Sequence, residues 1–340
     1  MALLHIEGFE QYDTPAQVNL SKRWTVTTSL SSIVTGRAGG SSNAFRTSIV
    51  NTFLQISGGI ATDFLVCGFA IQWQSSLSNL DLMHFRDGGL EQIVLSKTSG
   101  GDLRIARGAT ELEITSGLGL TSGIWYYIEM KILVHPSAGT YEVRVDGVAV
   151  LGPATSQNTR STANNNIDQV RFVSSNEDED FDDIYILDDA GSDNVDFLGD
   201  CTVETLLPDA DGATNDFTPV GSGSTNADRV DDGENPDDDT TYVHSSTVTD
   251  KDLYGFAALQ SGIDTIFGVS VGMYVRKEDA GHREIRALAR SGTAEVEGPS
   301  RQLSVDYNYV EGIYENDPDG GGDWDEAAVN AAQFGITIQT

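Results

Sequence analysis

Three aspartates in the second half of the chain have the type and spacing of a calcium site. Residues 209–216 read Asp-Ala-Asp-Gly-Ala-Thr-Asn-Asp, which places carboxylates at alternate positions before a glycine. Calcium prefers several oxygen ligands from Asp, Asn and carbonyl groups. The segment opens like an EF-hand loop, but Val220 stands where that loop needs Glu, and short Asp/Gly turns also form without metal. We therefore expect Asp209, Asp211 and Asp216 as candidate Ca²⁺ ligands, with a metal-free turn as the alternative.

Two further acidic segments lie in the second half of the chain, and they favour different interpretations. Residues 317–320 read Asp-Pro-Asp-Gly and, with Asp323, form a second acidic turn that is a weaker calcium candidate. The run 231–239 holds mostly acids with Gly, Asn and Pro, and we expect it to be a solvated loop.

The acids at 177–183 are the candidate for glycoside hydrolysis. That reaction needs two carboxylates that flank the scissile bond, as acids at alternate strand positions would. Residues 177–180 read Glu-Asp-Glu-Asp without an apolar residue between them, and Asp182 and Asp183 are adjacent, so they should point to opposite faces of a strand. We expect a solvated acidic loop that leads into a strand.

Other catalytic constellations are missing from the sequence. The five histidines, at positions 5, 84, 135, 244 and 282, form no zinc-like pair with one another or with a cysteine. The sequence has no G-x-S-x-G nucleophile elbow, although a dispersed Ser/His/Asp triad stays open. We expect the chain not to be an enzyme, to have no catalytic residues and to need no organic cofactor.

The charge is very uneven and restricts the class of partner. Residues 1–170 hold 14 acids and 11 bases, whereas residues 171–340 hold 38 acids and 9 bases. Because phosphate backbones and anionic membranes are bound by Lys and Arg, we expect neither nucleic acid nor membrane as a partner. Arg283, Arg286 and Arg290 form one basic cluster, which could pair within the chain or with a neighbouring subunit.

The elements that must position these groups are strands. Residues 64–73 are apolar on both faces, as in a central strand, and residues 102–107 alternate as in a half-buried strand. Asp146-Gly147 joins two strand-like runs and predicts a tight hairpin. A short helix is expected near Trp324, capped by Asp323 with Glu326 at its third position and ended by Gly335.

Composition places a domain boundary where Asp, Gly, Ser, Asn and Pro begin to prevail. We assign residues 1–192 and 193–340 to two β-sandwich domains, so the fold class is all-β with one short C-terminal helix. Cys67 and Cys201 then fall in different domains, and no disulfide framework is expected. The N-terminus lacks the basic and apolar regions of a signal peptide, and no apolar run is long enough to span a membrane.

The first half resembles a known fold family. Residues 125–131 read Trp-Tyr-Tyr-Ile-Glu-Met-Lys, residues 139–148 read Gly-Thr-Tyr-Glu-Val-Arg-Val-Asp-Gly-Val, and residues 181–186 read Phe-Asp-Asp-Ile-Tyr-Ile. These segments, with Gly-Phe-Glu at 8–10, resemble the lamin-G/concanavalin-A-like jelly roll. The resemblance implies two packed antiparallel sheets with Trp125 in the core, and it does not specify a function.

A narrower resemblance covers both halves. The opening Leu-Leu-His-Ile-Glu-Gly-Phe-Glu-Gln-Tyr at 3–12 and the acidic plan of the second half, ending in Trp324 to Gly335, are similar to virion structural proteins of tailed bacteriophages.

This second resemblance implies a structural or decorating virion component, made in the host cytoplasm, on the capsid or in the tail or fibre. The expected partners are further copies of the chain, a trimer being one form, and other virion proteins. The jelly roll could bind glycans or a host surface. The alternative is a lectin-type carbohydrate-binding module.

Overall fold

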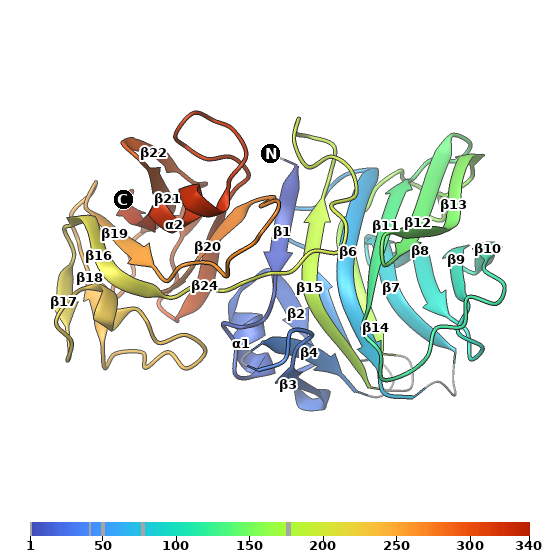
Figure 1. Ribbon diagram of the computed structural model, residues 1–340, viewed down its shortest axis with the longest axis horizontal. Coiled ribbons are helices and arrows are strands. Elements are labelled where there is room, and N and C mark those ends of the chain that lie inside the picture. Colours follow the sequence, from blue (N-terminus) through green and yellow to red (C-terminus); the bar gives the residue numbers. More distant parts are fainter. Residues whose placement is uncertain (1, 41, 49–51, 76–78, 175–177) are drawn as a thin grey trace. The chain divides into compact units, whose positions relative to one another are not determined.

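The computed structural model describes residues 2–40, 42–48, 52–75, 79–174 and 178–340. The chain divides into two compact units, Met1–Val203 and Glu204–Thr340 (Figure 1). Most ordered elements in both are antiparallel strands, so the predicted all-β class is confirmed. No helix in the described ranges is long and apolar enough to cross a membrane.

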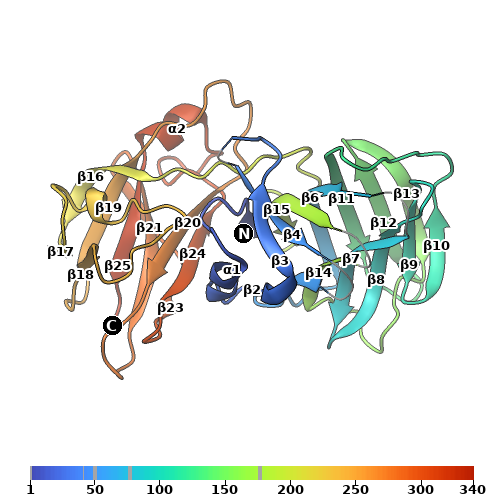
Figure 2. The same cartoon turned by 90° about the horizontal axis from the view of Figure 1, so that it is seen from below.

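The first unit is a sandwich of two antiparallel sheets, here called sheet A and sheet B (Figure 2). Sheet A contains, in spatial order, β13 (Val148–Gln157), β12 (Gly139–Val145), β11 (Tyr126–Leu133), β6 (Phe64–Trp73), β15 (Glu179–Leu187), β4 (Asn43–Thr47) and β3 (Ser31–Thr35), with β1 (Leu3–Glu7) also paired to β15. Sheet B contains β10 (Thr110–Ile114), β9 (Leu103–Arg107), β8 (Leu90–Lys97), β7 (Leu80–Asp87), β14 (Gln169–Ser174), β5 (Thr52–Ile56) and β2 (Trp24–Val26).

The core of this unit lies between the two sheets. Phe69 of β6 packs edge-on against Phe172 of β14 at 5.1 Å between ring centroids, and Phe181 of β15 lies 5.3 Å from Phe172. Because successive side chains of a strand point to opposite faces, these contacts tell which residues face inward and which face outward. The central position predicted for residues 64–73 is confirmed, since β6 pairs on both sides and is almost wholly buried.

Local sequence explains two features of the first unit. Asp146 and Gly147 both have positive φ, 48° and 77°, and join β12 to β13 in the predicted hairpin. A helix that was not predicted, α1 (Pro15–Leu20), begins with Pro15 after Thr14, and the Gln17 side chain accepts the backbone N–H of Thr14 at 2.7 Å. A 3₁₀ turn, η1 (Thr28–Leu30), follows β2.

Trp125 does not have the predicted role of core anchor. It precedes β11 and is only half-buried, whereas Tyr127 and Ile128 of that strand are buried. The buried tryptophans of the first unit are instead Trp24 and Trp73.

The first unit extends to Val203, so residues 193–203 belong to it and not to the second half, where the sequence analysis placed them. They fold back onto sheet A: Lys131 Nζ contacts Asp196 at 2.7 Å, and Gly199 N–H donates to Glu129 at 2.8 Å. Cys201 therefore lies in the same unit as Cys67, and both are free thiols.

The second unit contains one larger sheet and two strand pairs. The larger sheet has the order β16 (Pro208–Asn215), β19 (Lys251–Phe256), β25 (Gln333–Ile338), β21 (Glu284–Ser291) and β22 (Ala294–Glu297), with β23 (Arg301–Gln302) paired to β21. The pairs are β17 (Thr218–Val220) with β18 (Tyr242–His244) and β20 (Val269–Val275) with β24 (Asn308–Tyr314); a 3₁₀ turn, η2 (Ala227–Arg229), precedes β18.

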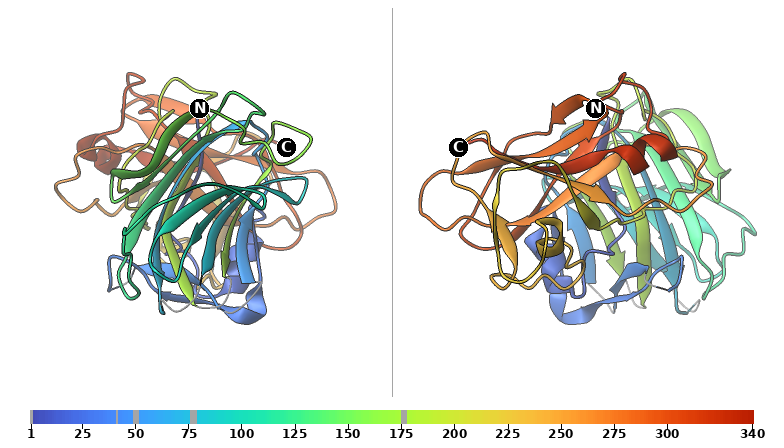
Figure 3. Two further views of the ribbon diagram at one scale, coloured as in Figure 1. Left: turned by 90° about the vertical axis from the view of Figure 1, so that its right-hand side faces the viewer. Right: turned by 60° about the vertical axis from the view of Figure 1, so that its left-hand side comes forward.

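The predicted C-terminal helix exists as α2 (Glu326–Ala331), with two corrections (Figure 3). Its N-cap is Asp325, whose side chain accepts the Ala328 N–H at 2.7 Å, and not Asp323. Gly335 does not end the helix; it lies in β25, where an added Cβ would meet the Asp252 carbonyl oxygen at 1.9 Å. Trp324 is buried in this unit's core, as the pattern predicted.

Candidate functional site

The outer face of sheet B gathers polar and basic side chains from five neighbouring strands. Phe172 points into the core, so its neighbour Arg171 points outward. Arg171 stands directly opposite Gln55 of β5 on one side and His84 of β7 on the other. We call this surface the sheet B face; it consists of Phe53, Gln55, Asp81, His84, Arg86, Glu91, Val94, Ser96, Arg104, Ala106, Gln169 and Arg171.

Amide side chains hold two of the arginines on this face. The Gln55 Oε1 atom accepts hydrogen bonds from Arg171 Nε at 2.7 Å and from Arg86 Nη1 at 3.2 Å. Arg86 also donates to Gln169 Oε1 at 3.3 Å and to the Gly89 carbonyl oxygen. The Arg171 guanidinium lies over the Phe53 ring, 4.1 Å from its centroid. The two guanidinium groups are thereby fixed in position by neutral partners.

His84 lies at the centre of the face and is almost buried. The Asp81 Oδ2 atom is 3.4 Å from its Nε2, and the Glu91 Oε1 atom is 3.6 Å from its Nδ1. Neither contact is a hydrogen bond, and the buried Nε2 atom has no hydrogen-bond partner among the described residues.

Neighbouring β9 extends the face. Arg104 stands opposite Ser96 and donates to its hydroxyl oxygen at 3.1 Å. Ala106 stands opposite Val94, and both are buried although they point away from the core. The surrounding long side chains therefore cover the floor of the face and place their polar ends at its surface.

The electrostatics of the face follow from the crowding of two cations. Burial and the neighbouring Arg86 lower the pKa of Arg171 to about 10. Arg171 remains charged at neutral pH, but its charge costs free energy in the free protein. A negative charge placed between Arg86 and Arg171 would offset the repulsion between them.

Sequence reasoning missed this face. His84 was noted only as one of five scattered histidines, and the alternation at 102–107 was used to predict a strand and not a site. An alternating pattern at 169–173, Gln-Val-Arg-Phe-Val, was the available signal for outward polar residues. The partners Gln55 and Arg171 are 116 residues apart, so their meeting depends on strand order.

The acidic run at 177–183 differs from the sequence prediction. Glu177 lies outside the described residues. Glu179 and Asp180 are not in a solvated loop; they lie in β15 and are buried, on opposite faces. Asp180 forms a bidentate pair with Arg46, at 2.6 and 2.8 Å, and Glu179 stands opposite Trp73. Their opposite orientation does not make a carboxylate pair across one bond.

Asp182 and Asp183 lie on the same side of sheet A, contrary to the alternation expected of adjacent residues. The strand is irregular between Asp182 and Tyr185, and Asp183 has a φ of 49°. Asp182 accepts the Arg37 backbone N–H at 2.8 Å, and Asp183 accepts Arg37 Nε at 2.9 Å. Burial, followed by the neighbouring Asp183, raises the pKa of Asp182 to about 7.

The calcium candidates are placed on a strand and not in a turn. Asp209 and Asp211 are exposed residues of β16, and Gly212 allows the close approach of Leu253, whose carbonyl oxygen would be 2.6 Å from an added Cβ. Asp211 Oδ1 accepts the Ala227 N–H, and Asp216 Oδ2 accepts the Lys251 N–H. No group of three or more acidic, His or Cys side chains in the described ranges is arranged to hold a metal ion.

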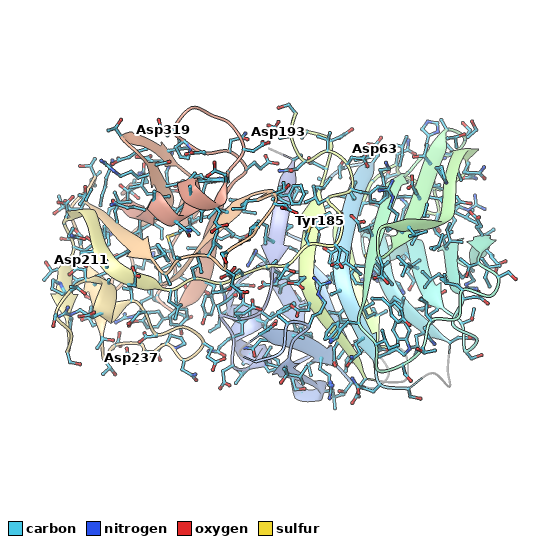
Figure 4. The ribbon with its side chains drawn as sticks, viewed as in Figure 1. Asp63, Tyr185, Asp193, Asp211, Asp237 and Asp319 are labelled. Atoms are coloured by element: carbon cyan, nitrogen blue, oxygen red, sulfur yellow. The ribbon has the colours of Figure 1, made fainter. Side chains whose placement is uncertain are left out.

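The other acidic segments are held by the chain itself. Figure 4 labels Asp211 on β16, Asp237 in the 231–239 loop and Asp319 in the 317–320 turn. In the loop, the Tyr274 hydroxyl donates to Asp238 at 3.0 Å and Arg276 pairs with Asp239 at 2.7 Å, so it is anchored at one end and not simply solvated.

The basic cluster pairs inside the second unit. Arg283 contacts Asp279 at 2.6 Å, Arg286 contacts Glu297 at 3.2 Å, and Arg290 contacts Glu295 at 2.8 Å. Of the two alternatives for this cluster, the structure contains the pairing within the chain.

Comparison with known proteins gives fold neighbours only. No protein-family model and no curated protein matches the sequence. A GH131 β-glucanase catalytic domain from Podospora anserina is similar over 56% of this chain and 97% of its own, with 12% identity and a TM-score of 0.39. The alginate lyase AlgAT5, from polysaccharide lyase family 7, matches 45% of this chain and 81% of its own, at 8% identity and a TM-score of 0.34.

A Trypanosoma rangeli sialidase matches 46% of this chain, with 11% identity and a TM-score of 0.34, but the match spans only 26% of the sialidase. The prediction that the chain is not an enzyme is corrected by these neighbours, because they include a β-glucanase, a sialidase and an alginate lyase. A fold shared with such proteins gives no ground for excluding catalysis.

Proposed function

We propose that the first unit is a carbohydrate-recognition domain and that the sheet B face is its binding surface. The observation that carries the proposal is the continuous row Gln55, Arg171, His84 and Arg86 across three adjacent strands, in which Gln55 accepts hydrogen bonds from both arginines and the strand register places His84 between them. Binding sites fix their ligands with a small number of well-placed polar groups on a rigid scaffold. The row on sheet B likewise places a few polar groups on paired strands.

The chemistry of the row suits a sugar. Adjacent ring hydroxyls both donate and accept hydrogen bonds, and amide and imidazole groups offer both functions while guanidinium groups supply paired donors. The groups sit on strands and not on loops, so they are held in place before a ligand arrives. The half-buried Phe53 ring, beneath Arg171, adds apolar surface at one end of the row.

The test is glycan-array binding of the full chain and of a double variant, Gln55→Ala with His84→Ala. We expect the wild type to bind a defined subset of glycans and the double variant to lose at least 10-fold in affinity for them. Gln72→Ala, on the outer face of sheet A, is the matched control and should bind like the wild type. The proposal would be contradicted if the double variant bound glycans as tightly as the wild type, or if the wild type bound no glycan on the array.

We further propose that the chain is carried on a tailed-bacteriophage particle, with other copies of itself and other virion proteins as partners. The support is the resemblance of residues 3–12 and of the acidic second half to virion structural proteins. Peptide mass spectrometry of purified particles from a phage that encodes this chain should detect it in stoichiometric amounts. Its absence from the particles would reject the proposal.

A further inference from the structure

Three arginines of the sheet B face form no ion pair with a described residue, in a chain with a formal net charge of −32. Among the described residues, no carboxylate lies within ion-pairing distance, 4.0 Å, of Arg86, Arg104 or Arg171. Elsewhere in the first unit, the arginines at 23, 37, 46 and 144 pair with Glu7, Asp183, Asp180 and Glu142. Arg107 and Arg160 of the same unit also have no carboxylate within this distance among the described residues, so the sheet B face is distinguished by three such arginines on one surface.

The strand register places the three guanidinium groups on one surface. Arg171 stands opposite His84, and Arg86 lies two residues beyond His84 on the same strand, so both point outward. Arg104 stands opposite Ser96, which is two residues from Val94, the partner of His84 on β8. The cations thus span β14, β7 and β9.

Their neutral partners orient the arginines but leave their charge in place. A glutamine or serine oxygen accepts a guanidinium N–H without adding negative charge. Two half-buried cations, Arg86 and Arg171, remain side by side; burial and this repulsion lower the pKa of Arg171, and the Glu91 carboxylate offsets them only in part. An anion bound between them would form charge-assisted hydrogen bonds with donors that are already positioned.

We propose that the ligand of the sheet B face is an acidic polysaccharide whose sugar carboxylates are bound by Arg86 and Arg171, with Arg104 binding further along the chain. The proposal rests on the carbohydrate-binding function proposed above. Guanidinium groups match planar carboxylates in a bidentate manner, which makes carboxylate the preferred anion. Nucleic acid fits less well, since it needs many phosphate contacts and the chain as a whole is strongly acidic.

The experiment compares acidic oligosaccharides with their own methyl esters. Oligogalacturonate, oligomannuronate and oligosialate are titrated into the full chain by calorimetry, each beside the ester that has the same sugars without the charge. We expect at least one acid to bind at least 10-fold more tightly than its ester. The difference should shrink between 50 and 500 mM NaCl, because salt screens charges at a partly exposed surface.

Two variants assign the effect to the face. Arg86→Gln with Arg171→Gln should abolish the difference between acid and ester, whereas Arg107→Gln, one residue beyond Ala106 and so directed to the other side of β9, should keep it. Circular dichroism checks that both variants fold. A sulfated oligosaccharide and single-stranded DNA of matched length serve as competing anions.

The possible results separate the two proposals. If acid and ester bind equally and the double variant is unchanged, this inference is overturned while carbohydrate binding stands. If DNA or the sulfated sugar binds at least as tightly as the best carboxylate oligosaccharide, the assignment of carboxylate as the preferred anion is wrong. If no acidic, esterified or neutral glycan binds, the proposed function itself has failed.

Discussion

The outer faces of the two sheets of the first unit differ in the partners of their basic side chains. On sheet A, residues 193–203 fold back over the strands and the basic side chains pair with acids, as Arg46 does with Asp180 and Lys131 does with Asp196. On sheet B, Arg86 and Arg171 are held by Gln55 and Gln169. One face is closed by its own chain, and the other keeps its positive charge available.

This difference in partners indicates which cations stabilise the fold and which are open to a ligand. A buried cation paired with an acid contributes to stability mainly because removal of its partner would be costly. A cation held by amides contributes little and costs some free energy where a like charge is near. Substitutions on sheet A should therefore change folding, and those on sheet B should change binding.

The largest expected effect is the loss of Arg37. This side chain contacts Asp183 at 2.9 Å, Asp200, and the Cys201 carbonyl oxygen at 2.5 Å, and Asp183 is buried. Arg37→Met should lower the free energy of unfolding by about 3 kcal/mol, because it leaves a buried carboxylate without its partner. Urea unfolding followed by tryptophan fluorescence measures it, since Trp24, Trp73 and Trp125 all lie in the first unit.

The matched variant is Arg171→Met on sheet B. It should change the free energy of unfolding by no more than about 0.5 kcal/mol, as is usual for surface positions, and the loss of repulsion with Arg86 favours a small gain. Equal destabilisation by both variants would remove the distinction between the two faces.

A smaller loss is expected from Gly68→Ala. The Tyr185 ring, labelled in Figure 4, covers Gly68, and an added Cβ would stand 2.1 Å from its Cε1. The Tyr185 hydroxyl also donates to Glu129 at 2.5 Å, so the ring cannot move freely. We expect a loss of about 2 kcal/mol from overpacking. Gly58→Ala is the control, since nothing lies within 4 Å of its added Cβ; a loss there of the same size would show that the cost is not due to Tyr185.

A third test uses pH. Burial, and then the neighbouring Asp182, raise the pKa of Glu10 to about 9. The folded state therefore holds a proton that the unfolded state releases near pH 4.5, so this stabilisation is present at low pH and is lost as the pH rises toward 9. Relative to Glu10→Gln, the wild type should lose at least about 1 kcal/mol between pH 5 and 8.

Thermal unfolding at several pH values measures this difference, with Glu111→Gln as an exposed control. If the two glutamine variants show the same pH dependence relative to the wild type, Glu10 does not hold a proton in the folded state.

Sequence patterns predicted the strands well because strand formation depends on local alternation. The 64–73 strand and the Asp146-Gly147 hairpin follow from residues that are neighbours in the chain. The α1 helix also had a local signal in Thr14, Pro15 and Gln17, which was overlooked.

The site could not be predicted in the same way. His84 and Arg171 are neighbours only because β7 pairs with β14, and local alternation does not give strand order. The position of Asp183 depends on a backbone irregularity with positive φ, for which an Asp-Asp pair gives no clear signal. The turn expected at residues 209–216 is an alternating acidic strand, because Gly212 permits close approach of β19 and does not reverse the chain.

Carbohydrate binding at the sheet B face is tested most sharply by a crystal structure of the full chain with the oligosaccharide that binds best in the titrations. We expect the sugar on the sheet B face, with a hydrogen bond to Gln55 or His84 and a carboxylate about 2.8 Å from the guanidinium nitrogens of Arg86 or Arg171. A sugar bound on the outer face of sheet A or on the second unit, with the sheet B face empty, would contradict it.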